Sequence, residues 1–306
     1  MRVSYFLGID GGGSQTTCVL GDESKVLASV TVGGSNIVRL GERQTRAALE
    51  QGLREACKAA AIKPAQITAV CAGIAGAARE ENRAQIAAIL SKLVGAQVTV
   101  VGDMEIAHQA ALNGSPGIVV ISGTGSIAYG RDASGHSARA GGWGFAFSDE
   151  GSGHWIGVQA IAAVARSLDA GTCTKLSERI LESWHLASYD ELMQQANASP
   201  APNFAALFPD VLVAAEAGDS AACDLLTRAG VELAGLAVVV FRRLWKPNDS
   251  ITIAQAGGVF ENSPTVRDSF QRELKNSIPQ AEIFLSQARA AEGALAMARK
   301  LNSSSA

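Results

Sequence analysis

The sequence has few cysteines and no strongly basic segment, and each shortage argues against a class of protein. Lys and Arg number 26 against 29 Asp and Glu, and no run of Lys or Arg exceeds two residues. This balance argues against nucleic acid or an anionic membrane as a partner. The five cysteines form no Cys-x-x-Cys pair, which disfavours a disulfide framework or a zinc ribbon. No stretch approaches the ~20 apolar residues of a membrane span, so we expect a cytoplasmic protein.

Glycine is abundant instead, and it gathers at the ends of apolar segments. The chain has 32 glycines, and three glycine turns at 10–14, 122–126 and 256–259 each follow an apolar stretch. The first two turns lead into a second strand-like segment, so each predicts a β-hairpin. A backbone without Cβ atoms lets N–H groups approach and surround phosphate oxygens. The three turns together therefore indicate a phosphate-binding protein.

Two familiar phosphate motifs can be tested directly. No G-x-x-x-x-G-K-[ST] sequence occurs, which excludes a P-loop NTPase at the level of the motif. Residues 123–128 fit the G-x-G-x-x-A dinucleotide fingerprint, but that fingerprint requires a helix to begin at the turn. The turn residues of 130–135 follow within a few positions, so a hairpin fits and a helix does not.

Pro116-Gly117 is the clearest internal boundary in the 306-residue chain. The segment after it opens as the N-terminus does, with an apolar strand, a glycine turn and a returning strand. This weak internal repeat predicts two related α/β domains, 1–115 and 116–287. The helix expected at 288–301 is predicted to pack back on the first domain.

The apolar patterns predict a series of strands and helices. We expect strands near 3–9, 16–20, 26–32, 67–71, 97–101, 118–121, 127–130 and 250–254, and helices near 42–60, 81–93, 105–112, 221–244 and 288–301. Residues 155–245 as a whole are expected to be mainly helical. The helix at 221–244 is apolar all round in its second half, which predicts either buried packing or a subunit interface. A homodimer therefore remains open.

Four motifs together resemble a known family. The segments Gly-Ile-Asp-Gly-Gly-Gly-Ser at 8–14, Ile-Ser-Gly-Thr-Gly-Ser at 121–126, Gly-Gly-Trp-Gly at 141–144 and Asp-Glu-Gly-Ser at 149–152 look like those of the N-acetylglucosamine kinase group of the BadF/BadG/BcrA/BcrD ATPase family. The likeness runs from residue 7 to about residue 293. It implies two ribonuclease-H-like (actin-like ATPase) domains, with mixed five-stranded sheets flanked by helices and a cleft between them. It also implies ATP and Mg²⁺ as cofactors, and transfer of the γ-phosphoryl group to the 6-hydroxyl of N-acetylglucosamine or glucosamine.

The resemblance assigns roles to particular residues. Asp103 follows the strand at 97–101 and would be the general base, the alternative being a helix N-cap. Asp10 would face Mg²⁺ through water, because a hard cation prefers carboxylate oxygen. ATP and its phosphates would contact Asp10, Gly11, Gly12, Gly13, Ser14, Thr16, Gly123, Thr124, Gly125, Gly257 and Gly258. Glu105 and Glu150 are left between a catalytic role and ordinary solvated carboxylates.

The expected sugar contacts are Asn36, Asp103, Ser126, Gly142, Trp143, Gly144 and Asp149. Trp143 alone would more often be a core aromatic, and Asn36 alone a turn residue. Ile127 stands where some N-acetylglucosamine kinases carry Asn, and isoleucine cannot make the corresponding hydrogen bond. Glucosamine is therefore a serious candidate beside the acetylated sugar.

Two other functions are compatible with the same fold. An ATPase activator of an iron–sulfur dehydratase would need cysteines that hold a cluster, and neither Cys173 nor Cys223 lies in a glycine-flanked cluster sequence. A non-catalytic, nucleotide-dependent sensor would not need the acidic residue at position 103. Both remain as alternatives to the kinase.

Overall fold

The computed structural model describes residues 3–77 and 79–303. The chain forms two compact units, one of Met1–Ser115 with Gln287–Ala306 and one of Pro116–Ser286. We refer to them as unit 1 and unit 2 and describe each by itself. Among the described residues, no helix combines the length and the hydropathy that crossing a membrane requires.

Unit 1 is built on a mixed five-stranded sheet in the order β3-β2-β1-β4-β5. Its strands are β1 (Tyr5–Gly11), β2 (Gln15–Gly21), β3 (Val26–Gly33), β4 (Ile67–Ile74) and β5 (Gln97–Val101). β2 runs antiparallel to β1 and β3, whereas β1, β4 and β5 are parallel. The helices are α1 (Ile37–Ala59), α2 (Glu80–Leu93), α3 (Asp103–Leu112) and α11 (Ala290–Ser303), with a short 3-10 helix at Pro64–Gln66.

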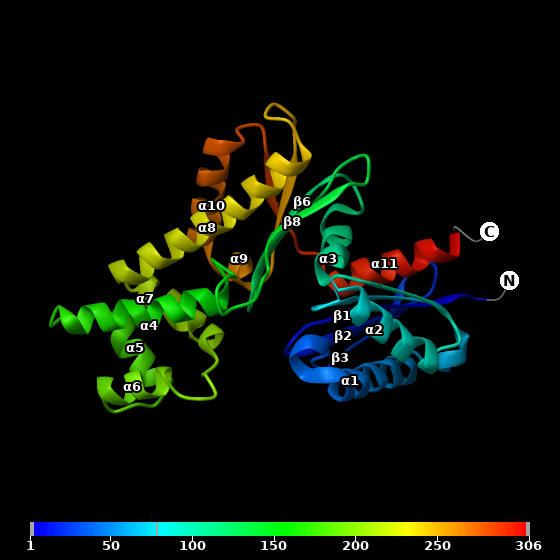
Figure 1. Ribbon diagram of the computed structural model, residues 1–306, viewed down its shortest axis with the longest axis horizontal. Helices are drawn as coiled ribbons and strands as arrows, with labels where there is room; N and C mark the ends of the chain where they lie inside the picture. The colour runs from blue at the N-terminus through cyan, green and yellow to red at the C-terminus, as the bar shows by residue number, and fades with distance from the viewer. Residues whose placement is uncertain (1–2, 78, 304–306) are drawn as a thin grey trace. The chain divides into compact units, whose positions relative to one another are not determined.

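Helices cover both faces of this sheet, which explains why most residues of its central strands β1 and β4 are buried. Alternate residues of β1 serve different cores: Leu7 lies in the core that includes α1 and α2, and Phe6 lies in the core that includes α3 and α11. Figure 1 shows α11, at the red end of the chain, alongside the blue strands of unit 1, and α11 packs on β1 and α3.

Unit 2 repeats the same sheet, in the order β10-β9-β6-β7-β8. Its strands are β6 (Gly117–Ser122), β7 (Ser126–Arg131), β8 (Ser137–Gly141), β9 (Thr252–Ala256) and β10 (Glu282–Leu285). The strand pairs have the same directions as their counterparts in unit 1, with β6 in the place of β1. The internal repeat that the glycine turns indicate is therefore a repeat of sheet topology.

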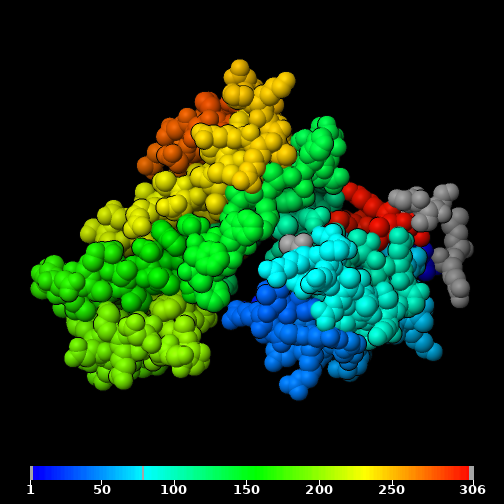
Figure 2. Space-filling model, viewed as in Figure 1, coloured from blue at the N-terminus to red at the C-terminus, as the bar shows by residue number. Residues whose placement is uncertain are grey.

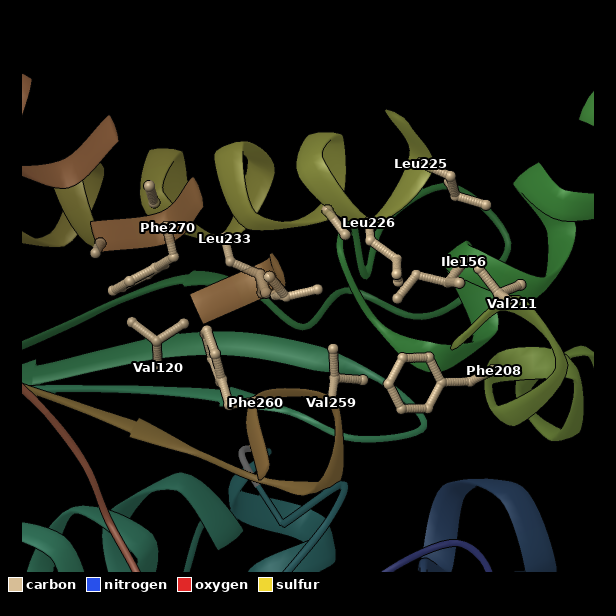
Figure 3. Packing of buried hydrophobic residues seen from close by; sticks show 14 of the residues in the cluster. Val120, Ile156, Phe208, Val211, Leu225, Leu226, Leu233, Val259, Phe260 and Phe270 are labelled. Carbon is tan, nitrogen blue, oxygen red and sulfur yellow. The ribbon is translucent and has the colours of Figure 1, made fainter. Parts of the chain in front are cut away.

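The helices of unit 2 enclose one large apolar core. They are α4 (Gly153–Asp169), α5 (Lys175–Ser183), α6 (Tyr189–Ala196), α7 (Phe208–Glu216), α8 (Ser220–Leu244), α9 (Gly258–Asn262) and α10 (Pro264–Ser277), with a 3-10 helix at Phe204–Leu207. Figure 3 shows Leu233 and Phe270 packed over Val120 and Phe260. Figure 2 shows the end of α8 in yellow and α10 in orange as adjoining layers of atoms.

The predicted elements are found, with some shifted ends. The strands and α-helices that the sequence did not predict are β8, β10, α9 and α10. The helix predicted from residue 42 begins at Ile37, with a break in helical geometry at Gly41 (φ 75°). β8 reads Ser-Ala-Arg-Ala-Gly and lacks an apolar strand pattern, whereas β10 reads Glu-Ile-Phe-Leu, an apolar segment of only four residues.

Candidate active site

The carboxyl ends of three parallel strands bring two aspartates together in unit 1. Asp10 of β1 pairs with Gly73 of β4, which pairs with Val101 of β5. Asp103 follows two residues after Val101, as the first residue of α3. Parallel strands end at one edge of a sheet, where α/β proteins gather their ligands.

The negative charge of Asp103 affects the pKa of Asp10. Burial raises the pKa of Asp10 to about 6, and the negative charge of Asp103 adds to the increase. Burial is the larger cause of this increase, and repulsion between the two carboxylates is the smaller one. Such a site suits a cation, which would relieve the repulsion.

Asp103 is held by the first turn of α3. Gly102, with extended backbone angles, is the N-cap of the helix, so the alternative interpretation of Asp103 as the cap is wrong. The backbone N–H of Met104 donates to Asp103 Oδ1 over 3.0 Å. Glu105 Oε1 accepts from the N–H of Gly102 at 2.9 Å, while the Glu105 N–H donates to the Gly102 carbonyl at 3.0 Å. Glu105 therefore fixes the start of the helix that carries Asp103.

The first glycine hairpin joins β1 to β2. The N–H of Gly12 donates to the carbonyl of Gln15 over 2.9 Å, which closes the turn. A Cβ at Gly11 would overlap the side chains of Ser35 and Ile74, so packing alone requires glycine there. Gly12 and Gly13 have more room, and they are the glycines at which a ligand can approach the backbone.

Thr16 differs from its predicted role as a phosphate contact. Its side chain is completely buried, and its hydroxyl donates to Ser35 Oγ over 2.8 Å. The Thr45 hydroxyl in turn donates to the Ser35 carbonyl over 3.3 Å. Thr16 thus ties the hairpin to the loop before α1. Sequence reasoning missed Ser35, because nothing in the motif marks a buried serine in that loop.

Asn36 is the N-cap of α1. Its Oδ1 accepts from the N–H groups of Val38 and Arg39 at 3.1 and 3.2 Å, which is the usual role of a capping side chain. This leaves the side-chain amide nitrogen for a ligand. Arg39 also lies beside the first hairpin, because a Cβ on Gly13 would lie 3.2 Å from its guanidinium. Sequence reasoning missed this residue.

The second glycine hairpin joins β6 to β7 and packs on the start of α4. The N–H groups of Gly153 and His154 donate to the carbonyls of Gly123 and Thr124 at 2.8 and 3.2 Å. The first N–H groups of α4 therefore bind the hairpin itself and are not free to hold an anion. The Thr124 side chain and the space beside Gly123, where a Cβ would meet no atom within 4 Å, remain for a ligand.

Ser126 is engaged inside unit 2, which differs from its predicted role as a sugar contact. The residue is buried, and its hydroxyl donates to the Glu150 carbonyl over 2.7 Å. The Ser122 hydroxyl makes the matching bond to the Gly151 carbonyl over 2.9 Å. These two bonds hold residues 149–152 against the hairpin, so the two motifs of the sequence form one structural block.

Asp149 connects this block to the Gly-Trp-Gly segment. Its carboxylate accepts hydrogen bonds from the backbone N–H groups of Ser126 and Gly144. Burial nevertheless raises its pKa, and the charge of Glu150 adds to the increase. Asp149 also has a positive φ of 67°, an uncommon conformation for a residue with a side chain. Such strain is typical of a functional position.

Trp143 lies at the surface, so the alternative interpretation of it as a core aromatic is wrong. The residue is 64% exposed, between Gly142 and Gly144, which have φ of 68° and 112°. The guanidinium carbon of Arg139 lies 4.0 Å from the centroid of the indole ring. Sequence reasoning missed Arg139 because no motif contains it.

The late Gly-Gly pair stands between β9 and α9. Gly257 has φ 95°, and a Cβ there would overlap the backbone of Ser122, so the fold itself requires this glycine. A Cβ at Gly258 would meet only the Asn262 side chain, at 3.9 Å, which leaves that position open. The contact with Ser122 brings the late glycines beside the second hairpin, so within unit 2 the predicted residues gather in one loop cluster.

Two sheets of one repeated topology, each with a glycine hairpin at its first strand, define the class as the actin-like ATPase fold. Residues 7–298 match the profile of the BadF/BadG/BcrA/BcrD ATPase family, and the chain belongs to this family. The predicted family and fold class are thereby confirmed.

Three similar proteins cover nearly the whole chain. The N-acetylmuramic acid/N-acetylglucosamine kinase of Clostridium acetobutylicum is 35% identical over 302 residues, which are 97% of this chain and 99% of the relative. The N-acetyl-D-glucosamine kinase of Dictyostelium discoideum is 28% identical, over 93% and 94% of the two chains. The structure of a provisionally named N-acetylglucosamine kinase from Chromobacterium violaceum superposes with a TM-score of 0.78 at 28% identity, covering 96% and 99%.

Proposed function

We propose that this protein is an ATP-dependent amino-sugar kinase that phosphorylates N-acetylglucosamine or glucosamine. The observation that carries the proposal is the pair of carboxylates, Asp10 and Asp103, at the strand edge from which the first glycine hairpin extends. A protein that binds a nucleotide but catalyses no reaction does not require a second acidic residue at this edge. The names of the Clostridium and Dictyostelium relatives support the same reaction.

Asp103 would act as the base. The acceptor hydroxyl oxygen forms a bond to the γ-phosphorus of ATP, and the bond from that phosphorus to the β-phosphate oxygen breaks. ADP leaves with the electron pair of the broken bond, and the hydroxyl proton passes to the Asp103 carboxylate. Most of the catalysis in such a transfer is positioning and charge neutralisation, so Asp103 chiefly orients the hydroxyl.

Asp10 is the residue best suited to Mg²⁺. Its carboxylate oxygens are the hard donors that Mg²⁺ prefers, and a cation would offset the negative charge of Asp103, which contributes to the raised pKa of Asp10. Among the described residues, no group of three or more His, Cys, Asp or Glu forms a preassembled metal site. One carboxylate is enough for Mg²⁺, which is usually held by one or two carboxylates, by phosphates and by water. When bound, the cation would neutralise charge on the phosphates.

Each unit has its own candidate backbone contacts for nucleotide phosphates. In unit 1 these are Gly12, Gly13 and Ser14, and in unit 2 they are Thr124, Gly125 and Gly258. Gly11, Gly257 and Thr16 would contribute by packing, because each is tightly enclosed by protein atoms.

The candidate sugar contacts are Asn36 in unit 1, and Trp143 with the backbone of Gly142 and Gly144 in unit 2; the proposed acceptor is the 6-hydroxyl. Asp149 would place this segment, since it accepts from the Gly144 N–H. The Clostridium relative favours the acetylated sugar. A relative named as a glucosamine kinase from Vibrio cholerae, 24% identical over 76% of this chain and 78% of its own, keeps the free amine in consideration.

A coupled assay of ADP release tests the proposal. The purified protein is given Mg·ATP with N-acetylglucosamine, glucosamine, N-acetylmannosamine or glucose in parallel. We expect sugar-dependent ADP release, with the highest kcat/KM for one of the first two sugars. ADP release that no sugar stimulates would contradict the proposed function.

A further inference from the structure

The glycine turns proposed to hold ATP contain no basic side chain. Residues 5–21, which form the first hairpin with its two strands, include no Lys, Arg or His, and they include the acidic Asp10. The turns at 122–126 and 256–259 also lack a basic residue. Backbone N–H groups can bind phosphate oxygens, but the phosphates of ATP carry several negative charges. A basic side chain from another segment is therefore expected beside one of these turns.

Arg39, in the first turn of α1, provides such a side chain in unit 1. A Cβ on Gly13 would lie 3.2 Å from Arg39 Nη1 and 3.6 Å from its Cδ, so the side chain lies against the tip of the first hairpin. Arg39 and Ser14, the residue after Gly13, are both exposed. The guanidinium and the tip of the hairpin are thus accessible to one ligand.

Backbone hydrogen bonds fix the start of α1 against this hairpin. The N–H groups of Ser35 and Asn36 donate to the Gly12 carbonyl at 3.0 and 3.1 Å. The N–H of Arg39 donates in turn to Asn36 Oδ1 at 3.2 Å. The backbone that carries Arg39 is therefore positioned relative to the hairpin before a ligand binds, which lowers the entropy cost of using its side chain.

The positive charge of Arg39 is not neutralised within the part of the chain that the structure describes. The ion pairs there do not include it, and the first turn of α1 has no acidic residue. Glu42, the next acid along the helix, pairs with Arg46 at 2.8 Å. The pKa of Asp10 is raised by burial and by Asp103, and no basic side chain lowers it. The guanidinium is therefore available for an external anion.

We propose that Arg39 binds the β- and γ-phosphate groups of ATP at the first glycine hairpin. A guanidinium suits this role because it is permanently charged and its planar fork can bind a phosphate with two parallel hydrogen bonds. The inference rests on the proposed function, which supplies the nucleotide. It adds a residue that lies outside the glycine motif and supplies the positive charge that the motif lacks.

Calorimetric binding of Mg·ATP and of AMP, each without sugar, tests the proposal. In Arg39→Gln the Kd for Mg·ATP should rise about ten- to a hundredfold, the loss expected for hydrogen bonds to a charged group. The ratio of the Kd for AMP to the Kd for Mg·ATP should fall by a similar factor, because AMP has neither of the two phosphates. Arg39→Lys should recover part of the loss, since an ammonium keeps the charge without the planar fork.

Arg43→Gln is the matched control, because it removes the same charge from an exposed position one turn further along α1. Its Kd for Mg·ATP should stay within about twofold of the wild type. An equal loss in Arg43→Gln would overturn the proposal, because the effect would then be a general one of net charge. Equal losses for Mg·ATP and AMP in Arg39→Gln would also overturn it and make Arg39 a support for the hairpin.

Binding without sugar separates this proposal from the proposed function. If Mg·ATP binding depends on Arg39 as expected but no sugar is phosphorylated, the proposed function fails and the role of Arg39 stands. If a sugar is phosphorylated and Arg39→Gln raises only the KM for that sugar, the proposed function stands and the role of Arg39 fails. A wild-type protein that binds no Mg·ATP would overturn both.

Discussion

The negative charge of Asp10 lowers the free energy of unfolding of the ligand-free protein. In the unfolded chain its carboxyl has an ordinary pKa of 3.8, and in the fold burial and Asp103 raise the pKa to about 6. Between these values the folded state holds the proton more tightly than the unfolded chain does. The free energy of unfolding therefore falls as pH rises through this window, and the loss persists above it. A bound cation would reverse the effect.

We predict that Asp10→Asn stabilises the ligand-free protein at neutral pH and above. The gain should be about 2–3 kcal/mol, since each pKa unit corresponds to 1.36 kcal/mol, and it should shrink as pH falls from 6 towards 4. Denaturant unfolding of the two proteins between pH 4 and 8 measures the difference. Phosphoryl transfer should be strongly reduced in the same variant, because a neutral amide is a poorer partner for Mg²⁺.

Asp22→Asn is a control for which the expected change in stability at neutral pH has the opposite sign. Backbone N–H groups of Lys25 and Ser24 lower the pKa of this exposed carboxyl, so it stabilises the fold above its ordinary pKa. Its replacement should lower stability at neutral pH, with the deficit vanishing in acid. An Asp10→Asn protein that is no more stable than wild type at pH 8 would contradict the account of Asp10.

For two hydroxyl residues, the sequence predicts the neighbourhood but not the direction of the side chain. Thr16 and Ser126 stand inside glycine motifs, where a hydroxyl is expected to face a phosphate or a sugar. The fold directs both inward, to Ser35 and to the Glu150 carbonyl. A motif identifies the residue type and its neighbourhood, but the direction of a side chain depends on partners that are distant in the sequence.

At the scale of elements, the close packing of α11 on unit 1 depends on glycine. A Cβ on Gly293 would overlap the carbonyl of Ile106 and the backbone of Ala110 in α3. Gly8 of β1 has the same relation to Leu295 of α11. The last helix of the chain is therefore positioned by two contacts that admit no side chain.

We predict that Gly293→Ala lowers the free energy of unfolding by about 1–3 kcal/mol, the cost of overpacking a tight contact. Gly235→Ala is the matched control, because Gly235 lies in the exposed side of α8 with nothing within 4 Å of an added Cβ. That change should raise stability by about 0.5–1 kcal/mol, as alanine favours a helix interior over glycine. Thermal or denaturant unfolding distinguishes the two, and equal effects would contradict the packing argument.

Two of the elements that sequence reasoning missed, β8 and α10, lack a strong apolar run. β8 holds small residues at the edge of its sheet, and α10 alternates charged and apolar residues without a strong apolar run. The predicted strands of both hairpins were found because they are buried on both faces and bounded by glycine. A strand that is buried on both faces has a clear apolar sequence pattern, whereas the edge strand β8 does not.

At the scale of the whole molecule, one sheet topology occurs twice, and each copy carries a glycine hairpin at its central strand. The copies have diverged in their chemistry. Unit 1 carries the two acids, Asp10 and Asp103, and unit 2 carries the Gly-Trp-Gly segment and Asp149. The repeat could be read from the sequence, because the turns recur at the same place in each unit. The roles proposed for the separate residues remain predictions.

The most direct test of the central claim compares wild type with Asp103→Asn by ³¹P NMR of a mixture of Mg·ATP and N-acetylglucosamine or glucosamine. For the wild type we expect a new phosphomonoester signal, coupled to two protons if the 6-hydroxyl is the acceptor. For the variant we expect the rate to fall by about 10²–10⁴ while nucleotide binding is retained. Equal rates in the two proteins, or a wild type that forms only inorganic phosphate, would contradict the account.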